Sequence, residues 1–402
     1  ARLADKIAGI FVPTVMGISL VALVVWLLVG KPFDFALTNA ISVLVISCPC
    51  ALGLATPVAI MVGTGRGANM GILFKNAEAL ENLHRIDTVV FDKTGTLTVG
   101  RPAVTDVISC CVSAKELMQV AASLEKMSEH PFAKAILDKA IGLELLEVSS
   151  FQTLPGQGVS GIINNTRYYG GNRRLMEQLN IPVPEFEELV TAGKTPLYFA
   201  SETGKFLGAI AAADILKADT PMAIQKLHDL DLKVIMLTGD NQKTAEFIAE
   251  KAGIRHVVAE VLPTDKASVV AELKDRGRCV LMIGDGINDA PALAIADVGM
   301  AIGSGTDIAM ESADVVLMNR SLQSVAGAIS LSKATIRNIR QNLFWAFFYN
   351  SIGIPLAAGV FVSALGWRLN PMFGAAAMGL SSVFVVTNAL RLKFFKGINK
   401  SD

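Results

Sequence analysis

Four stretches of the chain contain no Asp, Glu, Lys or Arg, and they lie in pairs near its two ends. They are residues 7–29, 35–65, 341–367 and 369–390. Each is close to or longer than the ~20 residues that a helix needs to cross the hydrocarbon core of a bilayer. The pattern therefore predicts four membrane-spanning helices.

The region between these pairs is ordinarily charged and contains three short apolar runs, each followed by a polar loop that includes glycine. The runs are residues 87–91, 233–237 and 279–283. Apolar runs of this length, bounded by polar residues, are typical of buried strands. Together with helical segments between them, they predict an α/β domain. Its pattern is interrupted over residues 102–212, which we expect to form an inserted domain.

Composition agrees with a membrane protein. Hydrophobic residues make up 52% of the 402 residues, and the mean hydropathy of +0.48 is high for a soluble protein. The formal net charge is zero, so no general attraction to nucleic acid is indicated. Basic residues flank the outer ends of the first and last spans, whereas the short connections hold only Lys31 and Arg368. The positive-inside bias therefore predicts that both ends and the central region face the cytoplasm.

The ends of the three predicted strands carry the candidate chemistry. Asp92 follows the first strand, and a carboxylate, ionised at neutral pH, can attack a phosphoryl group without a partner base. Alone, Asp92 could equally be a turn or helix-capping residue. Asp285, after the third strand, and the backbone carbonyl of Thr94 would hold magnesium with it. The hydroxyl of Thr238 would donate to a phosphate, whose charge Lys266 would offset.

The second predicted span contains Ser47-Cys48-Pro49-Cys50. Proline interrupts a membrane helix, which is tolerated where the freed backbone groups line an enclosed cavity. Thiolates bind soft ions such as Cu(I) and zinc, so Cys48 and Cys50 predict an ion site. The alternative is a pair of inert buried cysteines beside a structural kink.

Each of the three strand ends carries a longer motif: Asp92-Lys93-Thr94-Gly95-Thr96, Thr238-Gly239-Asp240 and Gly284-Asp285-Gly286-Ile287-Asn288-Asp289-Ala290-Pro291. In these motifs and their order the chain resembles the P-type ATPases, a branch of the haloacid-dehalogenase-like phosphotransferases. The resemblance implies that ATP phosphorylates Asp92 with Mg²⁺ and that the cycle moves an ion. It also implies catalytic roles for the other motif residues, which are Lys93, Gly239, Asp240, Asn288 and Asp289.

The third predicted span contains Tyr349-Asn350 and the fourth contains Met378-Gly379-Leu380-Ser381-Ser382. Taken singly, Met378 could be core packing and Tyr349 an ordinary aromatic. With the two cysteines, they resemble the copper-transporting subgroup of the heavy-metal P-type ATPases, in which Cys-Pro-Cys is followed by Tyr-Asn and Met-x-x-Ser-Ser. Two thiolates, a thioether and neutral oxygens suit a soft monovalent cation. A zinc or cadmium pump would be expected to carry a charge in the last two spans, and none is there. The resemblance implies that Cu(I), or Ag(I), is bound by Cys48, Cys50, Tyr349, Asn350, Met378 and Ser382.

Two further groups have plainer alternatives. Asp5 could be an entry-site ligand for copper or a solvated charge beside a membrane helix. The insert resembles the nucleotide-binding domain of heavy-metal ATPases, although His130-Pro131 is also a common helix start. By resemblance, the adenine and its pocket involve Glu125, His130, Gly156, Gly158 and Asn172.

The predicted architecture is an α/β haloacid-dehalogenase-like catalytic domain with an inserted α+β nucleotide-binding domain, plus a helical membrane domain. Residues 66–85 are expected to form a helical extension from the second span to the catalytic strand. The five segments are residues 1–65 (spans one and two), 66–101 (first part of the phosphorylation domain), 102–212 (nucleotide-binding domain), 213–332 (second part of the phosphorylation domain) and 333–402 (spans three and four with a tail).

These features predict an ATP-driven Cu(I) exporter, a translocase, in a bacterial plasma (inner) membrane. Its expected partners are membrane lipid, ATP, a cytosolic copper donor and the actuator and N-terminal region of the same pump, but no nucleic acid. We find no Thr-Gly-Glu actuator element, so the chain resembles the C-terminal part of a pump and alone should not complete the cycle. The alternatives are a Zn/Cd pump, a membrane-anchored phosphatase of the same fold, or a non-enzymatic metal-binding membrane protein.

Overall fold

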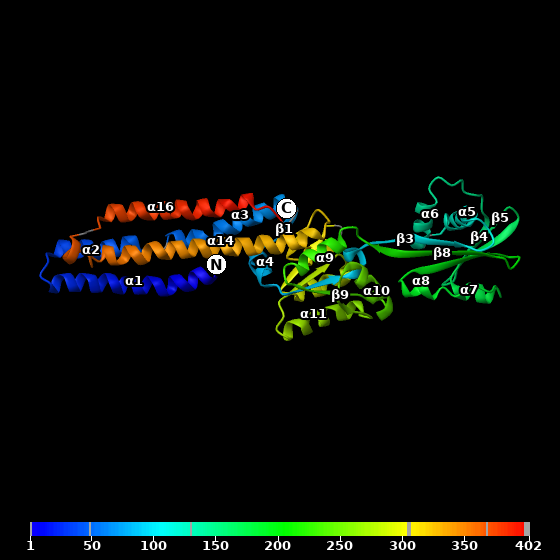
Figure 1. Ribbon diagram of the computed structural model, residues 1–402, viewed down its shortest axis with the longest axis horizontal. Coiled ribbons are helices and arrows are strands. Elements are labelled where there is room, and N and C mark those ends of the chain that lie inside the picture. The colour runs from blue at the N-terminus through cyan, green and yellow to red at the C-terminus, as the bar shows by residue number, and fades with distance from the viewer. Residues whose placement is uncertain (1, 48–49, 129–130, 304–306, 367–368, 398–402) are drawn as a thin grey trace. The chain divides into compact units, whose positions relative to one another are not determined.

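A computed structural model describes residues 2–47, 50–128, 131–303, 307–366 and 369–397 (Figure 1). The chain divides into two compact units. One comprises Ala1–Arg85 with Ser324–Asp402, and the other is Ile86–Gln323. The first contains the long apolar helices and the second contains strands β2 to β13, so the predicted separation of a helical part from an α/β part is confirmed.

The helical unit is built from five long helices that lie alongside one another in Figure 1. One buried cluster joins α3, α14 and α16 through Ala59, Leu343 and Val385, and another joins α1, α2 and α14 through Val15, Ile46 and Ala357. The helices are α1 (Arg2–Leu28), α2 (Phe33–Ile46), α3 (Cys50–Asn69), α14 (Gln323–Ala357) and α16 (Pro371–Leu390); the short α15 (Val362–Leu365) and η5 (Arg391–Phe394) complete the unit.

Buried amides tie α14 to α16. Asn338 donates from Nδ2 to the Asn388 carbonyl at 2.9 Å, and Asn388 donates from its own Nδ2 to Asn342 Oδ1 at 2.8 Å. Asn342 in turn donates to Asn338 Oδ1 at 3.2 Å. The amides satisfy one another, which is the condition for burying polar groups between membrane helices.

Within the described residues, two segments are long and apolar enough to cross a membrane. They are Gly9–Leu28 and Met372–Phe394, while α2 is a shorter apolar helix. The second predicted span is covered by α2 and α3 together. The complete set of four spans therefore stays a prediction from the charge pattern.

The expected continuous helix over residues 66–85 is wrong. Helix α3 ends at Asn69, and it is followed by β1 (Ile72–Phe74), α4 (Ala77–Asn82) and η1 (Leu83–Arg85). Gly71 adopts φ +74, a left-handed conformation that ends helices. The glycine therefore stops the helix before the charged residues that follow it.

The catalytic sheet is parallel, and its strands in the second unit follow the order β13-β12-β11-β2-β9-β10. Strand β2 is central, between β9 and β11, so the three runs identified from sequence are neighbours whose carboxyl ends meet at one edge. The strands are β2 (Thr88–Asp92), β9 (Lys233–Leu237), β10 (His256–Val258), β11 (Val280–Gly284), β12 (Val298–Ile302) and β13 (Val315–Leu317). The associated helices are α9 (Thr220–His228), α10 (Gln242–Ala252), α11 (Lys266–Asp275), α12 (Ala290–Ile295) and α13 (Asp307–Ser312).

The insert is a six-stranded antiparallel sheet with the order β3-β8-β7-β6-β5-β4. Side chains alternate across it, so Phe199 packs with α5 and α6 on one face while Tyr198 packs with α7 on the other. Its elements are β3 (Thr98–Ser109), α5 (Ala114–Glu125), α6 (Pro131–Lys139), β4 (Ser149–Leu154), β5 (Gly158–Ile163), β6 (Thr166–Gly171), α7 (Arg173–Gln178), α8 (Glu187–Thr191), β7 (Thr195–Ser201) and β8 (Phe206–Leu216).

Candidate active site

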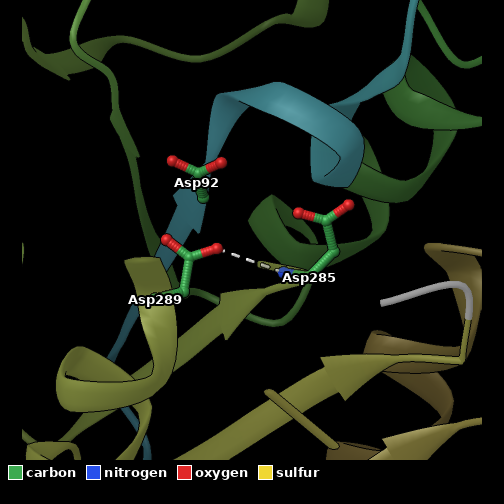
Figure 2. Close-up of side chains that lie close together, drawn as sticks. All are labelled: Asp92, Asp285 and Asp289. Atoms are coloured by element: carbon green, nitrogen blue, oxygen red, sulfur yellow. Dashed lines mark hydrogen bonds between the residues drawn. The ribbon is translucent and has the colours of Figure 1, made fainter. Parts of the chain in front are cut away.

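Three carboxylates meet where the central strands end (Figure 2). Asp92 is the last residue of β2, Asp285 follows β11, and Asp289 closes the short turn η4 (Ile287–Asp289). One oxygen of each lies within 4.8 Å of the others. Because β2 and β11 are adjacent and parallel, their ends bring together groups that are 193 positions apart in sequence, from 92 to 285. The hard oxygen ligands suit Mg²⁺.

Lys266, at the start of α11, joins two of these carboxylates. Its Nζ lies 2.6 Å from Asp92 Oδ1 and 2.7 Å from Asp289 Oδ1. The other oxygen of Asp289 accepts the backbone N–H groups of Asp285 and Gly286, each at 3.2 Å. Asp289 therefore fixes both the lysine and the loop that carries Asp285.

Burial and mutual repulsion disfavour full ionisation of this cluster. Burial, followed by the charge of Asp289, raises the pKa of Asp92 to about 7, although Lys266 opposes the shift. Burial and Asp289 likewise raise the pKa of Asp285. The expectation that Asp92 is fully ionised at neutral pH is therefore wrong for the metal-free site. A divalent cation among these oxygens would supply the positive charge that favours the ionised form.

The turn after Asp92 passes close to Asp285. Gly95 in this turn, η2 (Lys93–Leu97), has φ +71, and a Cβ at that position would lie 1.8 Å from Asp285 Oδ2. Both the conformation and the space exclude a side chain. Glycine is thus required for the close approach of the Asp92 loop to the second carboxylate.

The sequence analysis did not identify two residues, Lys217 and Asp214, that hold this turn through hydrogen bonds. Lys217 Nζ donates to the Gly95 carbonyl at 2.7 Å, and Asp214 accepts from Thr98 Oγ1 at 2.5 Å and from Gly100 N–H at 2.9 Å. Burial lowers the pKa of Lys217, although the nearby Asp285 and Asp219 charges act against that shift. The sequence did contain a sign of these contacts, because Asp214 and Lys217 place opposite charges at the end of the apolar run that forms β8.

The other predicted catalytic residues surround the carboxylates to different degrees. Lys93 forms an ion pair with Asp240 at 2.9 Å. The buried Thr238 directly follows β9, the strand beside β2, and its hydroxyl accepts the Asp240 N–H at 3.1 Å. Gly239 lies between them. The side chains of Thr94 and Asn288 are exposed.

Some of the predicted nucleotide residues come together in the insert. Asn172 Nδ2 donates to the Gly156 carbonyl at 2.9 Å, and Gly158 pairs with Gly171 across β5 and β6. A Cβ on Gly158 would lie 2.1 Å from the Gly170 carbonyl oxygen, so only glycine fits there. Glu125 is buried at the end of α5, and His130 lies outside the described residues.

The predicted ion-site residues are described only in part. Cys48 and the side chains of Cys50 and Asp5 lie outside the described residues. Asn350 is buried, with 8% of its surface exposed, whereas Tyr349 is 45% exposed and packs beside Trp345. The remaining two residues, on α16, are half-buried, and Ser382 Oγ donates to the Met378 carbonyl at 3.4 Å.

The raised pKa of Asp92 leads to a stability prediction for Asp92→Asn. A carboxyl whose pKa is higher in the folded state destabilises that state increasingly as pH rises from 3.8 toward 7. Asparagine cannot ionise, so the variant should be more stable than the metal-free wild type by about 1–3 kcal/mol at pH 8 and by less at pH 5. Thermal unfolding without magnesium measures both. Asp240→Asn, which removes a more exposed carboxylate, should give no such gain; an equal gain at both pH values would contradict the titration argument.

Comparing Gly95→Ala with Gly204→Ala separates the effect of a steric clash with Asp285 from the effect of backbone strain at a positive φ. Both Gly95 and Gly204 have positive φ, but Gly204 has nothing within 4 Å of its added Cβ. Alanine at Gly204 should therefore cost only about 1 kcal/mol of backbone strain, and alanine at Gly95 should cost at least about 2 kcal/mol. Gly95→Ala should also lose the rise in melting temperature that Mg²⁺ produces, because Asp285 is displaced. Retention of that rise would show that the close approach is not needed for the metal.

Comparison with known proteins agrees with this geometry. A family model described as haloacid dehalogenase-like hydrolase matches residues 86–297. The chain is 52% identical over 400 residues to copper-transporting ATPase 2 of Rhizobium meliloti (strain 1021), covering 97% of this chain and 48% of that protein. It is 50% identical over 399 residues to the probable copper-importing P-type ATPase A of Enterococcus hirae (strain ATCC 9790), covering 97% of this chain and 53% of that protein.

A solved structure extends the match to three dimensions. The crystal structure of a zinc-transporting PIB-type ATPase in the E2.Pi state has a TM-score of 0.86 and 36% identity, covering 97% of this chain and 63% of that one. The chain spans about half the length of the curated relatives it matches. With the carboxylate cluster and its three motifs, these similarities establish that the chain belongs to the heavy-metal P-type ATPases, within the haloacid-dehalogenase-like hydrolases.

Proposed function

We propose that this chain is the ATP-hydrolysing and ion-binding part of a pump that moves Cu(I) across a membrane through an aspartyl phosphate at Asp92. The observation that carries the proposal is the position of Asp92 beside Lys266, Asp285 and Asp289 at the end of the central strand. The cluster concentrates acceptors for a metal and one cation for a phosphoryl group in a buried site. These are the parts that phosphoryl transfer requires.

The chemistry follows from what each side chain can do. An oxygen of Asp92 attacks the terminal phosphorus of ATP, the bond from that phosphorus to the bridging oxygen breaks, and ADP leaves with its electron pair. Lys266 and the Thr238 hydroxyl stabilise the charge on the transferred group. Mg²⁺, held by Asp92, Asp285 and the Thr94 carbonyl, supplies charge neutralisation when bound. The pairing of Lys93 with Asp240 orients a second cation beside the nucleophile.

The insert is the proposed ATP-binding part. Gly156 has open space where a side chain would stand, so a flat ligand can approach its backbone, and Asn172 holds that turn through the Gly156 carbonyl. Gly158 instead allows β5 and β6 to pair closely. We assign Glu125 and His130 to the adenine on the basis of the family motif.

Copper as the cargo is supported by ligand softness and by the names of the relatives. Cys48 and Cys50 are proposed to hold the ion with Asn350, Met378 and neighbouring oxygens. The exposed aromatic position of Tyr349 makes it the weakest member of the proposed set. One structural neighbour is titled as zinc-transporting, but the predicted last two spans here contain no charged residue. That absence favours a soft monovalent ion.

Export from the cytoplasm, a bacterial inner membrane and delivery by a cytosolic copper donor complete the proposal. The region of the pump not contained in this chain would supply dephosphorylation. One relative is named a probable importer, so direction requires uptake measurements in oriented vesicles.

Metal-dependent phosphorylation tests the proposal in the parent-length protein. With labelled ATP, Cu(I) or Ag(I) should stimulate an acid-stable acyl phosphate at least about 10-fold over Zn(II), because the proposed site is soft. Asp92→Asn should remove the label, and Cys48→Ser or Cys50→Ser should remove its metal dependence.

Cys279→Ser is the matched control, because it removes a thiol from the second unit and should leave the label unchanged. Stimulation by Zn(II) alone would overturn the choice of copper. If ATP yields no acyl phosphate while phosphate esters are hydrolysed, the protein is a phosphatase instead.

A further inference from the structure

Two adjacent cysteines lie on the surface of the insert, directly after β3. Cys110 and Cys111 are both exposed, and their sulfur atoms are 3.7 Å apart. Strand β3 ends at Ser109, and the backbone N–H of Cys110 bonds to the Leu207 carbonyl of β8 at 2.8 Å. The backbone of the pair is therefore fixed at the end of a strand pairing. None of the roles proposed above uses these two thiols.

A bend in the chain brings the two thiols to the same side. Within a strand, successive side chains point to opposite faces of the sheet. Residues 110–112 form a bend outside β3 instead, so the adjacent side chains of Cys110 and Cys111 lie together. Two metal–sulfur bonds of about 2.3 Å reach sulfur atoms up to about 4.6 Å apart. The separation of 3.7 Å therefore lets one ion contact both sulfurs.

The two thiols are poorly placed to form a disulfide with each other. Consecutive Cα atoms lie about 3.8 Å apart, whereas the Cα atoms of a disulfide usually lie about 4.4–6.8 Å apart. Cys110 and Cys111 are accordingly free cysteines. Both sulfurs are thus available to a ligand.

The charges around the pair favour a bound cation. Cys111 lies two residues before Ser113, the N-cap of the twelve-residue helix α5, and a helix N-terminus favours a nearby thiolate. The pKa of Cys110 is raised, first by its hydrogen bond with Cys111 and then by the charge of Cys111. The two sulfurs therefore resist carrying a negative charge together. A cation bound by both of them removes that repulsion.

The kind and number of ligands favour Cu(I) over zinc. Thiolates select soft ions, among them Cu(I) and zinc. Zinc takes four protein ligands in structural sites and three in catalytic ones. Within the described part of the chain, no His, Asp or Glu joins these two sulfurs in a group of three ligand atoms that lie within 4.8 Å of one another. A pair of thiolates is an incomplete site for zinc but is sufficient for Cu(I).

We propose that Cys110 and Cys111 together bind one Cu(I) ion on the surface of the insert. Both thiols release their protons to solvent, and each sulfur donates an electron pair to the ion. The ion is neither oxidised nor reduced, and the two thiolates with Cu(I) carry one net negative charge. This site is separate from the proposed membrane site and uses none of its ligands. Because the pair is exposed, the bound ion is accessible to thiols of other molecules.

The experiment measures Cu(I) binding by the whole chain in lipid nanodiscs without oxygen. Cys48→Ser with Cys50→Ser first removes the proposed membrane ligands. Competition with bicinchoninate, a colorimetric Cu(I) chelator, then gives the stoichiometry and the affinity. We expect one ion per chain, and an affinity at least about 100-fold weaker for Cys110→Ser or Cys111→Ser, because a second thiolate on the same chain acts at high effective concentration. Cys279→Ser is the matched control and should leave binding unchanged.

A relocated pair of thiols separates the geometry of the bend from the number of cysteines. Ile108→Cys with Ser109→Cys is made in a chain that also carries Cys110→Ser and Cys111→Ser. The two new thiols are adjacent and occupy exposed positions, but they lie inside β3, where successive side chains point to opposite faces. This variant should bind Cu(I) at least about 10-fold more weakly than the native pair, because its thiolates cannot act on one ion together.

Three outcomes overturn the inference: full affinity in either single serine variant, equal affinity in the relocated pair, or Cu(I)-dependent dimers, which would place the ion between two chains. A second measurement covers a chain destabilised by the loss of Cys48 and Cys50. In the chain that keeps both, Cys110→Ser with Cys111→Ser should bind one ion fewer with an unchanged metal-free melting temperature. An unchanged number of ions would exclude the surface site. The proposed pump is tested separately by its phosphorylation.

Discussion

The confinement of three carboxylates and one ammonium group at the end of a buried strand is the constraint on which the catalytic unit depends. Asp92, Asp285 and Asp289 carry more negative charge than Lys266 can neutralise, so burial raises the pKa values of Asp92 and Asp285. The site is consequently incomplete without a further cation. A cation bound among these oxygens would lower the pKa of Asp92 and so increase the ionised fraction of the proposed nucleophile.

The two strands that connect the insert to the catalytic domain lie next to the turn that follows Asp92, and residues just after β8 hydrogen-bond to that turn. The antiparallel pair of β3 and β8 brings Thr98 opposite Leu216, so the inserted domain leaves and returns at neighbouring points of the catalytic domain. Just beyond this pair, Lys217 holds the Gly95 carbonyl and Thr220 donates to the Leu97 carbonyl at 2.8 Å. A tilt of the insert on its two strands would therefore act on the turn that follows Asp92. The proposed binding of nucleotide to the insert would act on Asp92 through these few hydrogen bonds.

The sequence predicted what depends on local pattern and failed where distant partners decide. The three apolar runs became adjacent strands because hydrophobic burial and the meeting of parallel strand ends are general rules. The hydrogen bond from Thr98 to Asp214 joins residues 116 positions apart, so the opposite charges at the end of β8 could mark a polar contact but could not identify its partner. The ionisation of Asp92 was misjudged because a pKa depends on burial that only the fold provides. The helix expected over residues 66–85 failed for a local reason, since a single glycine, Gly71, adopts a left-handed conformation.

The helical unit contains both paired and unpaired buried polar groups. The difference matters in a bilayer because no water is available there to an unpaired group. The amides of Asn338, Asn342 and Asn388 satisfy one another and hold α14 against α16. This network fixes the helix pair and continues to Arg391, which donates to Asn388 Oδ1 at 3.2 Å. Ser47 is buried with its hydroxyl unpaired, close in sequence to two cysteines. Since water cannot relieve that cost inside a membrane, the unpaired hydroxyl of Ser47 is a local cost to stability that the packing of the surrounding helices must offset.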